Sequence, residues 1–165
     1  MDNSKFLNAS YFHSSVKKIY SGELDGIVNK KSDKMAKVVY EPAHLNPDFL
    51  DDDARRGKGK DFATWVFSEE PDTAEGLFSN GLELFMDAYF EPDASVGLHR
   101  HSTTDEIYYI ISGSITMTTI TGMGKEVCVE LNEGDAHAVF AGESHFGTAG
   151  AKGCRAIVVA LKNRG

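Results

Sequence analysis

A succession of short segments rich in β-branched and aromatic residues is the feature that most limits the folds open to this chain. Such segments, bounded by glycine, proline, asparagine or aspartate, are typical of β-strands. Strands are expected at residues 35–40, 62–67, 81–90, 107–111, 115–120, 126–131, 136–140 and 155–161, with turns between them such as residues 112–114. Many short strands separated by turns predict an all-β sandwich or barrel, and a jelly-roll barrel suits their number.

The β-rich part defines a single domain. A chain of 165 residues is long enough for one domain with a substantial core. We expect residues 61–165 to form the β-barrel, and residues 1–60 to form an N-terminal arm and loop that packs on the barrel rather than a separate domain. The arm, in which a short helix at residues 14–20 is one interpretation, either contacts a neighbouring subunit or covers an edge of its own sheet. Residues 46–60 switch from acidic to basic and are interpreted as a solvated loop more readily than as a guard over a site.

Charge and hydropathy narrow the partners. The chain has 25 acidic and 17 basic residues, which gives a net charge of −8 and repels the backbone of nucleic acids. Neither a signal-peptide pattern nor an apolar run long enough to span a bilayer is visible, so we expect no membrane partner and a cytoplasmic protein. Cys128 and Cys154 are too few for a disulfide framework, and free thiols are the expectation.

A candidate metal site begins at His99 and His101. Side chains of a strand alternate between its two faces, so these two imidazoles point to the same side and can reach one ion. Glu106 lies five residues beyond His101, and a straight strand would turn it to the other face. The polar residues 102–105 are turn-forming and can supply the bend that brings the Glu106 carboxylate round to the histidines.

A fourth donor is expected from elsewhere in the fold, and His145 is the candidate because it follows a strand and a glycine-containing turn. The spacing from His99 to Gly113 and the run from Gly134 to His145 resemble the two sequence motifs of the cupin superfamily. The chain departs from those motifs at three scaffold positions, which are occupied by Asp93, Phe140 and Ala149.

The resemblance implies a double-stranded β-helix, or jelly-roll barrel, and a three-histidine, one-glutamate metal site. Its ligands would be His99, His101, Glu106 and His145. Three imidazoles and one carboxylate suit one divalent transition metal, whether Fe, Mn, Ni, Co, Cu or Zn, and leave coordination positions open for water or substrate. A homodimer is also expected, from the resemblance and from the N-terminal arm.

Two further residues have open roles. Tyr108 shares a strand face with Glu106, so its phenol is either a catalytic group that binds substrate or transfers a proton, or a core tyrosine with a satisfied hydroxyl. His137 is interpreted as a surface residue or as a partner of a ligand, since the metal does not need it.

Three functions fit such a site. The first is a small-molecule enzyme of the dioxygenase or oxidoreductase type with a mononuclear metal, as the resemblance implies. The second is a metal-dependent isomerase, epimerase or lyase that works by proton transfer. The third is a cupin that binds a sugar or another small ligand without catalysis, because one fold serves many functions.

Overall fold

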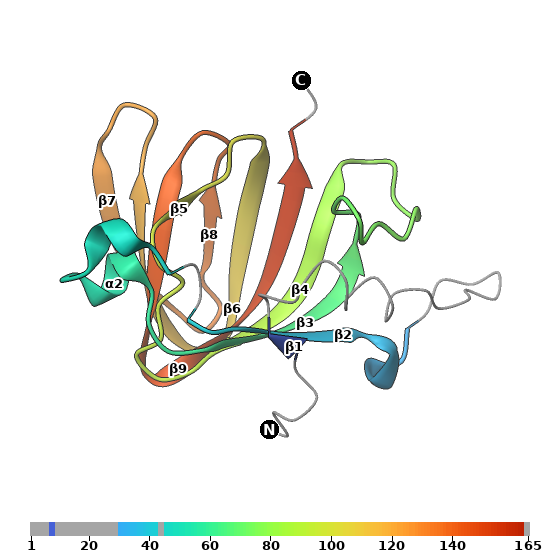
Figure 1. Ribbon diagram of the computed structural model, residues 1–165, viewed down its shortest axis with the longest axis horizontal. Helices are drawn as coiled ribbons and strands as arrows, with labels where there is room; N and C mark the ends of the chain where they lie inside the picture. Colours follow the sequence, from blue (N-terminus) through green and yellow to red (C-terminus); the bar gives the residue numbers. More distant parts are fainter. Residues whose placement is uncertain (1–6, 9–29, 43–44, 164–165) are drawn as a thin grey trace.

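The computed structural model describes residues 7–8, 30–42 and 45–163, and in this part of the chain the β-strand is the dominant element (Figure 1). The expected helix at residues 14–20 lies outside the described residues. The strands are β1 (Leu7–Asn8), β2 (Ala36–Tyr40), β3 (Asp61–Ser68), β4 (Leu82–Phe90), β5 (His99–Arg100), β6 (Thr104–Ile120), β7 (Glu126–Asn132), β8 (Ala136–Val139) and β9 (Ser144–Lys162).

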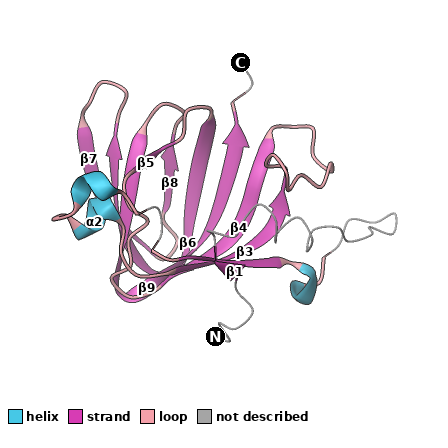
Figure 2. Ribbon diagram, viewed as in Figure 1, coloured by secondary structure: helices cyan, strands magenta, loops and turns pink. Residues whose placement is uncertain are grey.

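The strands form one curved antiparallel sheet in the order β1-β2-β3-β4-β9-β6-β7, in which β5 also pairs with β9 and β8 with β6. Only the pairing of β1 with β2 is parallel among the pairs of described strands. Figure 2 shows that the described helices are short and lie outside the sheet. None of them is long and apolar enough to cross a membrane.

The curved sheet of antiparallel strands confirms the prediction of an all-β jelly-roll fold.

The two longest strands differ from the expectation of separate strands with a turn at residues 112–114. Strand β6 has 17 residues and β9 has 19, and both continue through this region with local shifts of register. Gly113 adopts a φ of 76° and Gly153 a φ of 77°, which bends the strands without reversing them. A Cβ on Gly113 would lie 2.1 Å from the carbonyl oxygen of Gly153, so glycine is required where the strands approach.

The inward faces of the strands form a single hydrophobic core. Its largest fully buried apolar side chains are Trp65, Phe90, Ile110, Ile115 and Met117. Alternate residues of β3, β4, β6 and β9 contribute to it, as expected for strands with one face toward the interior. Burial of this apolar surface is the main favourable contribution to folding.

The charged segment before β3 is more ordered than a solvated loop. It contains the 3-10 helix η4 (Pro47–Phe49) and the helix α2 (Asp53–Arg56), whose N-terminus is capped by the Asp52 side chain. The Nη2 atom of Arg55 lies 2.8 and 3.0 Å from the two carboxylate oxygens of Glu126 on β7. Its guanidinium also lies 5.4 Å from the ring centre of Phe146 on β9. The segment is thus attached to the outside of the sheet. A further 3-10 helix, η3 (Ser32–Lys34), precedes β2.

Candidate metal centre

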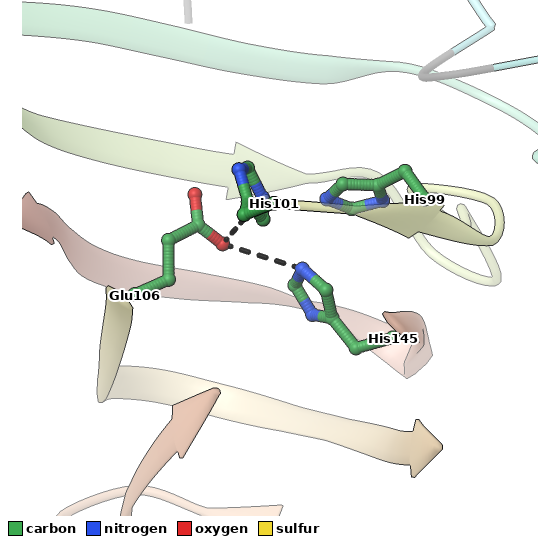
Figure 3. A group of neighbouring side chains, drawn as sticks. All are labelled: His99, His101, Glu106 and His145. Atoms are coloured by element: carbon green, nitrogen blue, oxygen red, sulfur yellow. Dashed lines mark ion pairs between the residues drawn. The ribbon is translucent and has the colours of Figure 1, made fainter. Parts of the chain in front are cut away.

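The four residues expected to bind a metal are brought together in the interior of the sheet (Figure 3). His99 lies on β5, His101 directly after it, Glu106 on β6 and His145 on β9. Each offers one nitrogen or oxygen donor atom, and these four atoms all lie within 4.8 Å of one another. Residues separated by up to 46 positions in the chain, from 99 to 145, therefore converge on one point.

Strand register explains part of this convergence. His99 and His145 are directly opposite each other in the antiparallel pair of β5 and β9. Opposed residues of such a pair project to the same side of the sheet, so both imidazoles face the interior.

The chain then bends at residues 102–103 before β6 begins, as the polar sequence of this segment predicts. The bend is held by the turn that precedes β9. The backbone N–H of Gly142 donates to the carbonyl of His101 at 2.8 Å, and the N–H of Ala141 donates to the Asp105 carboxylate at 2.7 Å. The two motif regions are thus hydrogen-bonded to each other beside the site.

The spacing of the donors suits a shared cation. The Oε2 atom of Glu106 lies 3.5 Å from Nε2 of His101 and 3.4 Å from Nε2 of His145. These separations are long for hydrogen bonds. Two ligands each about 2.1 Å from an ion, at angles of about 90–110°, are separated by about 3.0–3.4 Å. The residues present therefore fit a divalent metal.

The third imidazole is fixed in orientation by the backbone. Nδ1 of His99 lies 3.0 Å from the carbonyl oxygen of Gly97. A carbonyl only accepts hydrogen bonds, so Nδ1 carries the proton and Nε2 keeps a free lone pair. This is the common arrangement of a metal-binding histidine, in which an outer acceptor selects the tautomer.

The electrostatics of the group favour a bound cation. Burial acts to raise the pKa of Glu106, but the surrounding imidazoles outweigh it and lower that pKa to about 2. Glu106 thus stays ionised although only 6% of its surface is exposed. The adjacent Glu106 carboxylate raises the pKa of His101, whereas burial lowers the pKa of His99. A fixed negative charge among nitrogen donors attracts a metal ion.

The hydroxyl of Tyr108 is directed at the site from the same strand as Glu106. It donates a hydrogen bond of 2.9 Å to Oε2 of Glu106 and is only 3% exposed. Burial and the charge of Glu106 raise the pKa of Tyr108, so the phenol keeps its proton and its role as a donor. The structure therefore shows Tyr108 in contact with a candidate ligand.

His137 is not part of the donor cluster. It lies on β8, is half-buried, and its Nε2 is 2.9 Å from the hydroxyl of Thr119. Burial lowers the pKa of His137. His137 is therefore only partly exposed, and its hydrogen bond is to Thr119 rather than to a candidate ligand.

Sequence reasoning missed a buried acid, Asp61, at the start of β3. It is 4% exposed, and burial together with the charge of Glu106 raises its pKa well above the usual value for aspartate. The expected strand began one residue later, at position 62. Ala63 and Trp65 face the core, and the side chains of a strand alternate with a period of two. If the strand is taken to begin two residues before Ala63, Asp61 lies on the same inner face.

The departures from the two motifs are accommodated by the backbone. Asp93 has a φ of 60°, the left-handed conformation that normally favours glycine. Phe140 uses a backbone N–H that proline would lack, since it donates to the carboxylate of Glu143 at 3.0 Å. The backbone at these two positions therefore suits the residues that this chain has there.

The fold and the cluster together define a small jelly-roll protein with a candidate metal centre of three histidines and one glutamate. Residues 53–165 match the model of the Cupin family, which is more than half of the chain. The chain belongs to the cupin family.

Some of the known proteins with similar sequence or structure have names related to oxalate. The chain is 31% identical over 108 residues to the oxalate-binding protein of Thermotoga maritima, an alignment that covers 66% of this chain and 79% of that protein. A Thermotoga maritima crystal structure described as a predicted oxalate decarboxylase superposes with a TM-score of 0.59 at 25% identity, covering 82% of this chain and 99% of the other.

A longer enzyme contains a part with the same fold. The oxalate decarboxylase of Lactobacillus farciminis, solved as a formate complex, superposes with a TM-score of 0.59 at 19% identity. The alignment covers 89% of this chain but only 36% of the enzyme, so this chain corresponds to about a third of its length. At this identity the similarity concerns the fold alone.

Proposed function

We propose that this protein is a metal-dependent cupin that binds a small carboxylate at one divalent metal ion and acts on it by lyase-type, proton-transfer chemistry. The observation that carries the proposal is the convergence of His99, His101, Glu106 and His145 to within 4.8 Å. A divalent metal bound there would act as a Lewis acid that polarises a ligand oxygen.

The protein's own groups would prepare this site in defined ways. His99 presents Nε2 because Gly97 holds Nδ1, and the Glu106 carboxylate is oriented by Tyr108. The full burial of His145 and the near-full burial of Glu106 exclude water from one side of the donor set. In such a desolvated setting, fixed charges act more strongly on a bound ligand than they do in water.

The names of the similar proteins support the choice of ligand. One relative is described as oxalate-binding and one similar structure as a predicted oxalate decarboxylase, so oxalate is the first ligand to test. These names also favour a lyase over the dioxygenase that the sequence led us to expect first. A decarboxylation of this kind consumes one proton and needs no net oxidant.

A ligand-binding protein without catalysis is the second candidate. It is favoured by the relative at 31% identity, which is named for binding oxalate rather than for converting it. Metal, ligand and binding residues would be the same in both cases, and only product formation distinguishes them.

The test uses the chain of 165 residues. Metal content is measured by elemental analysis, oxalate binding by calorimetry with and without metal, and formate and carbon dioxide from ¹³C-labelled oxalate by NMR under anaerobic conditions. We expect metal-dependent binding of oxalate together with oxygen-independent product formation. Binding without product would favour the second candidate. A protein that contains no metal and does not bind added metal would contradict the proposal.

His137→Ala is the matched control for this experiment, because His137 lies outside the donor cluster. It should retain metal and oxalate binding, whereas His101→Ala should lose both. Equal behaviour of the two variants would show that binding does not involve the candidate centre.

A further inference from the structure

The chain segment that leads into His99 is held by α2 through two backbone carbonyls. The hydroxyl of Ser95 donates to the carbonyl of Ala54 at 2.6 Å. The N–H of Leu98 donates to the carbonyl of Arg55, also at 2.6 Å. The last carbonyls of a helix have no partner within the helix, so α2 can offer them to a neighbouring segment. The helix is therefore joined to the residues directly before the first candidate ligand.

The peptide between Gly97 and Leu98 connects this contact to the imidazole of His99. Its N–H donates to the carbonyl of Arg55, and its own carbonyl oxygen lies 3.0 Å from Nδ1 of His99. Because a peptide group is planar, fixing its N–H also fixes the direction of its carbonyl. The position of α2 thus determines where the acceptor for Nδ1 of His99 points.

Ser95 adds a second link to the same stretch. It is 1% exposed, and its Oγ atom accepts the N–H of Gly97 at 3.3 Å while its hydroxyl proton is donated to Ala54. Gly97 has a φ of 70°, a conformation that glycine adopts at little cost. One buried hydroxyl therefore joins α2 to the residue whose carbonyl orients His99.

The side chain of Arg55 anchors α2 to the sheet. Its Nη2 atom lies 2.8 and 3.0 Å from the two carboxylate oxygens of Glu126 on β7. Its guanidinium lies 5.4 Å from the ring centre of Phe146, the residue that follows His145 on β9. Strand β9 is also the partner of β5, which carries His99. The helix and two of the candidate ligands are thus attached to the same part of the sheet.

We propose that α2 is a positioning element for the candidate metal ligand His99, and that it acts through Ser95 and the peptide between Gly97 and Leu98. This inference rests on the metal centre of the proposed function. A histidine binds a metal through the ring nitrogen that has no proton, and the hydrogen bond made by the other nitrogen decides which one that is. In this arrangement α2 keeps Nε2 of His99 available for an ion. The charged segment before β3 then belongs to the support of the metal centre.

Two variants break these links, and the chain offers a matched control for each. Ser95→Ala removes the hydroxyl, and Arg55→Gln removes the ion pair that anchors α2. Ser68→Ala is the control for the first, because Ser68 is also buried and its Oγ also accepts a backbone N–H two residues later at 3.3 Å. Arg155→Gln is the control for the second, because Arg155 also makes two contacts with one carboxylate, that of Asp87, at 2.7 and 2.9 Å.

The first measurement is the tautomer of His99 in the metal-free protein at pH 8, read from the ¹⁵N chemical shifts of the imidazole by NMR. Wild type and both controls should show the Nδ1–H form. Ser95→Ala and Arg55→Gln should show a mixture that includes the Nε2–H form, because the carbonyl of Gly97 is no longer held in place. A general loss of stability does not select between tautomers, so this readout separates positioning from a merely structural role.

The second measurement is the affinity for Mn²⁺ and for Zn²⁺, by competition with a chelator. Loss of an outer partner of a metal ligand lowers the affinity by about 10–100-fold, and the links broken here act one bond further out, so we expect a loss of about 10-fold. Both control variants should bind the two ions as wild type does.

The outcomes separate the two proposals. If Ser95→Ala and Arg55→Gln keep the wild-type tautomer and the wild-type affinity, the role of α2 is overturned and the proposed function stands. An equal loss of affinity in Ser68→Ala and Ser95→Ala would also overturn it, because the effect would then come from lost stability. If wild type binds neither ion, the proposed function fails, whereas the tautomer in the metal-free protein still decides the role of α2. Should Ser95→Ala not fold, Arg55→Gln carries both measurements.

Discussion

The Tyr108 hydroxyl donates a hydrogen bond to Oε2 of Glu106, the same oxygen that lies nearest to the imidazoles of His101 and His145. The phenol and the carboxylate are both almost fully buried and come from the same face of β6. One side chain thus fixes the position of a candidate metal ligand two residues away. Outer hydrogen-bond partners of this kind orient the ligands of metal sites.

Tyr108→Phe should weaken metal binding without abolishing it. Loss of an outer partner of a ligand lowers metal affinity by about 10–100-fold. The affinity is measured by competition with a chelator of known strength. Tyr109→Phe is the control, because Tyr109 lies on the same strand but is 47% exposed, and it should bind metal as wild type does. Equal affinities for the two variants would show that the hydrogen bond does not position Glu106.

Replacement of His101 or His145 by alanine removes a donor atom. The loss of metal affinity should therefore exceed about 100-fold, the largest loss usually seen when a hydrogen-bond partner of a ligand is removed. The two variants should differ in stability. His145 is fully buried, so His145→Ala leaves a cavity and should lower the free energy of unfolding by about 2 kcal/mol or more. His101 has 26% of its side chain exposed, and its loss should cost less. Elemental analysis and urea denaturation check both expectations, and full metal occupancy in either variant would contradict the ligand set.

The stability of the metal-free protein should depend on pH through Glu70. Burial and the charge of Glu83 raise the pKa of Glu70 to about 7. Below pH 4.5, Glu70 is protonated in both the folded and the unfolded chain and does not change the free energy of unfolding. As the pH rises from about 4.5 to 7, the unfolded chain loses this proton more readily than the folded protein, so the fold is destabilised. Glu70→Gln should therefore be more stable than wild type at pH 8, by up to about 3 kcal/mol, with little difference at pH 4.5.

Urea denaturation at several pH values measures this effect. Glu130→Gln, which changes an exposed glutamate, should show no such pH-dependent difference from wild type. A parallel pH dependence of wild type and Glu70→Gln would show that Glu70 titrates normally.

Gly113→Ala should severely destabilise the fold. A methyl group there meets the carbonyl of Gly153 at 2.1 Å, and the φ of 76° adds a backbone cost. We expect a loss of at least about 3 kcal/mol in the free energy of unfolding, since strain of this kind accounts for exceptional single-residue effects. Gly124→Ala is matched to it in φ, at 78°, but has open space around it, and should cost only about 1–2 kcal/mol. Similar losses for both would show that the close approach does not matter.

Three of the four candidate ligands were predictable because they are local in sequence, whereas His145 was found from its place after a strand and turn and from the resemblance to the cupin motifs. His99, His101 and Glu106 lie within one segment, and their residue types are those of common metal donors. The fold class followed from the strand pattern. The continuity of β6 could not be predicted in the same way, because the residue types of Ser112 and Gly113 are typical of a turn. In the structure they pair with β9, and the close approach of Gly113 to Gly153 makes this part of β6 a bend within the strand.

Other features depended on contacts that a sequence does not contain. Arg55 looked like part of a solvated charge run, and its two contacts with Glu126 join residues 71 positions apart. The inward position of Asp61 depended on where β3 begins, and strand ends are the least certain part of a sequence-based expectation. The homodimer remains a prediction.

The continuous pairing of β6 with β9 limits how the length of this chain can vary. These two strands are paired on both sides of the Gly113 bend, from Thr104 opposite Lys162 to Ile120 opposite Ser144. Inserting or deleting one residue within either strand would rotate the side chains beyond that point to the opposite face, and would carry Glu106 or His145 away from the candidate metal centre. Related proteins that keep the four candidate ligands should therefore differ in length at the hairpin of residues 121–125 or in the segment 69–81, and not within these two strands.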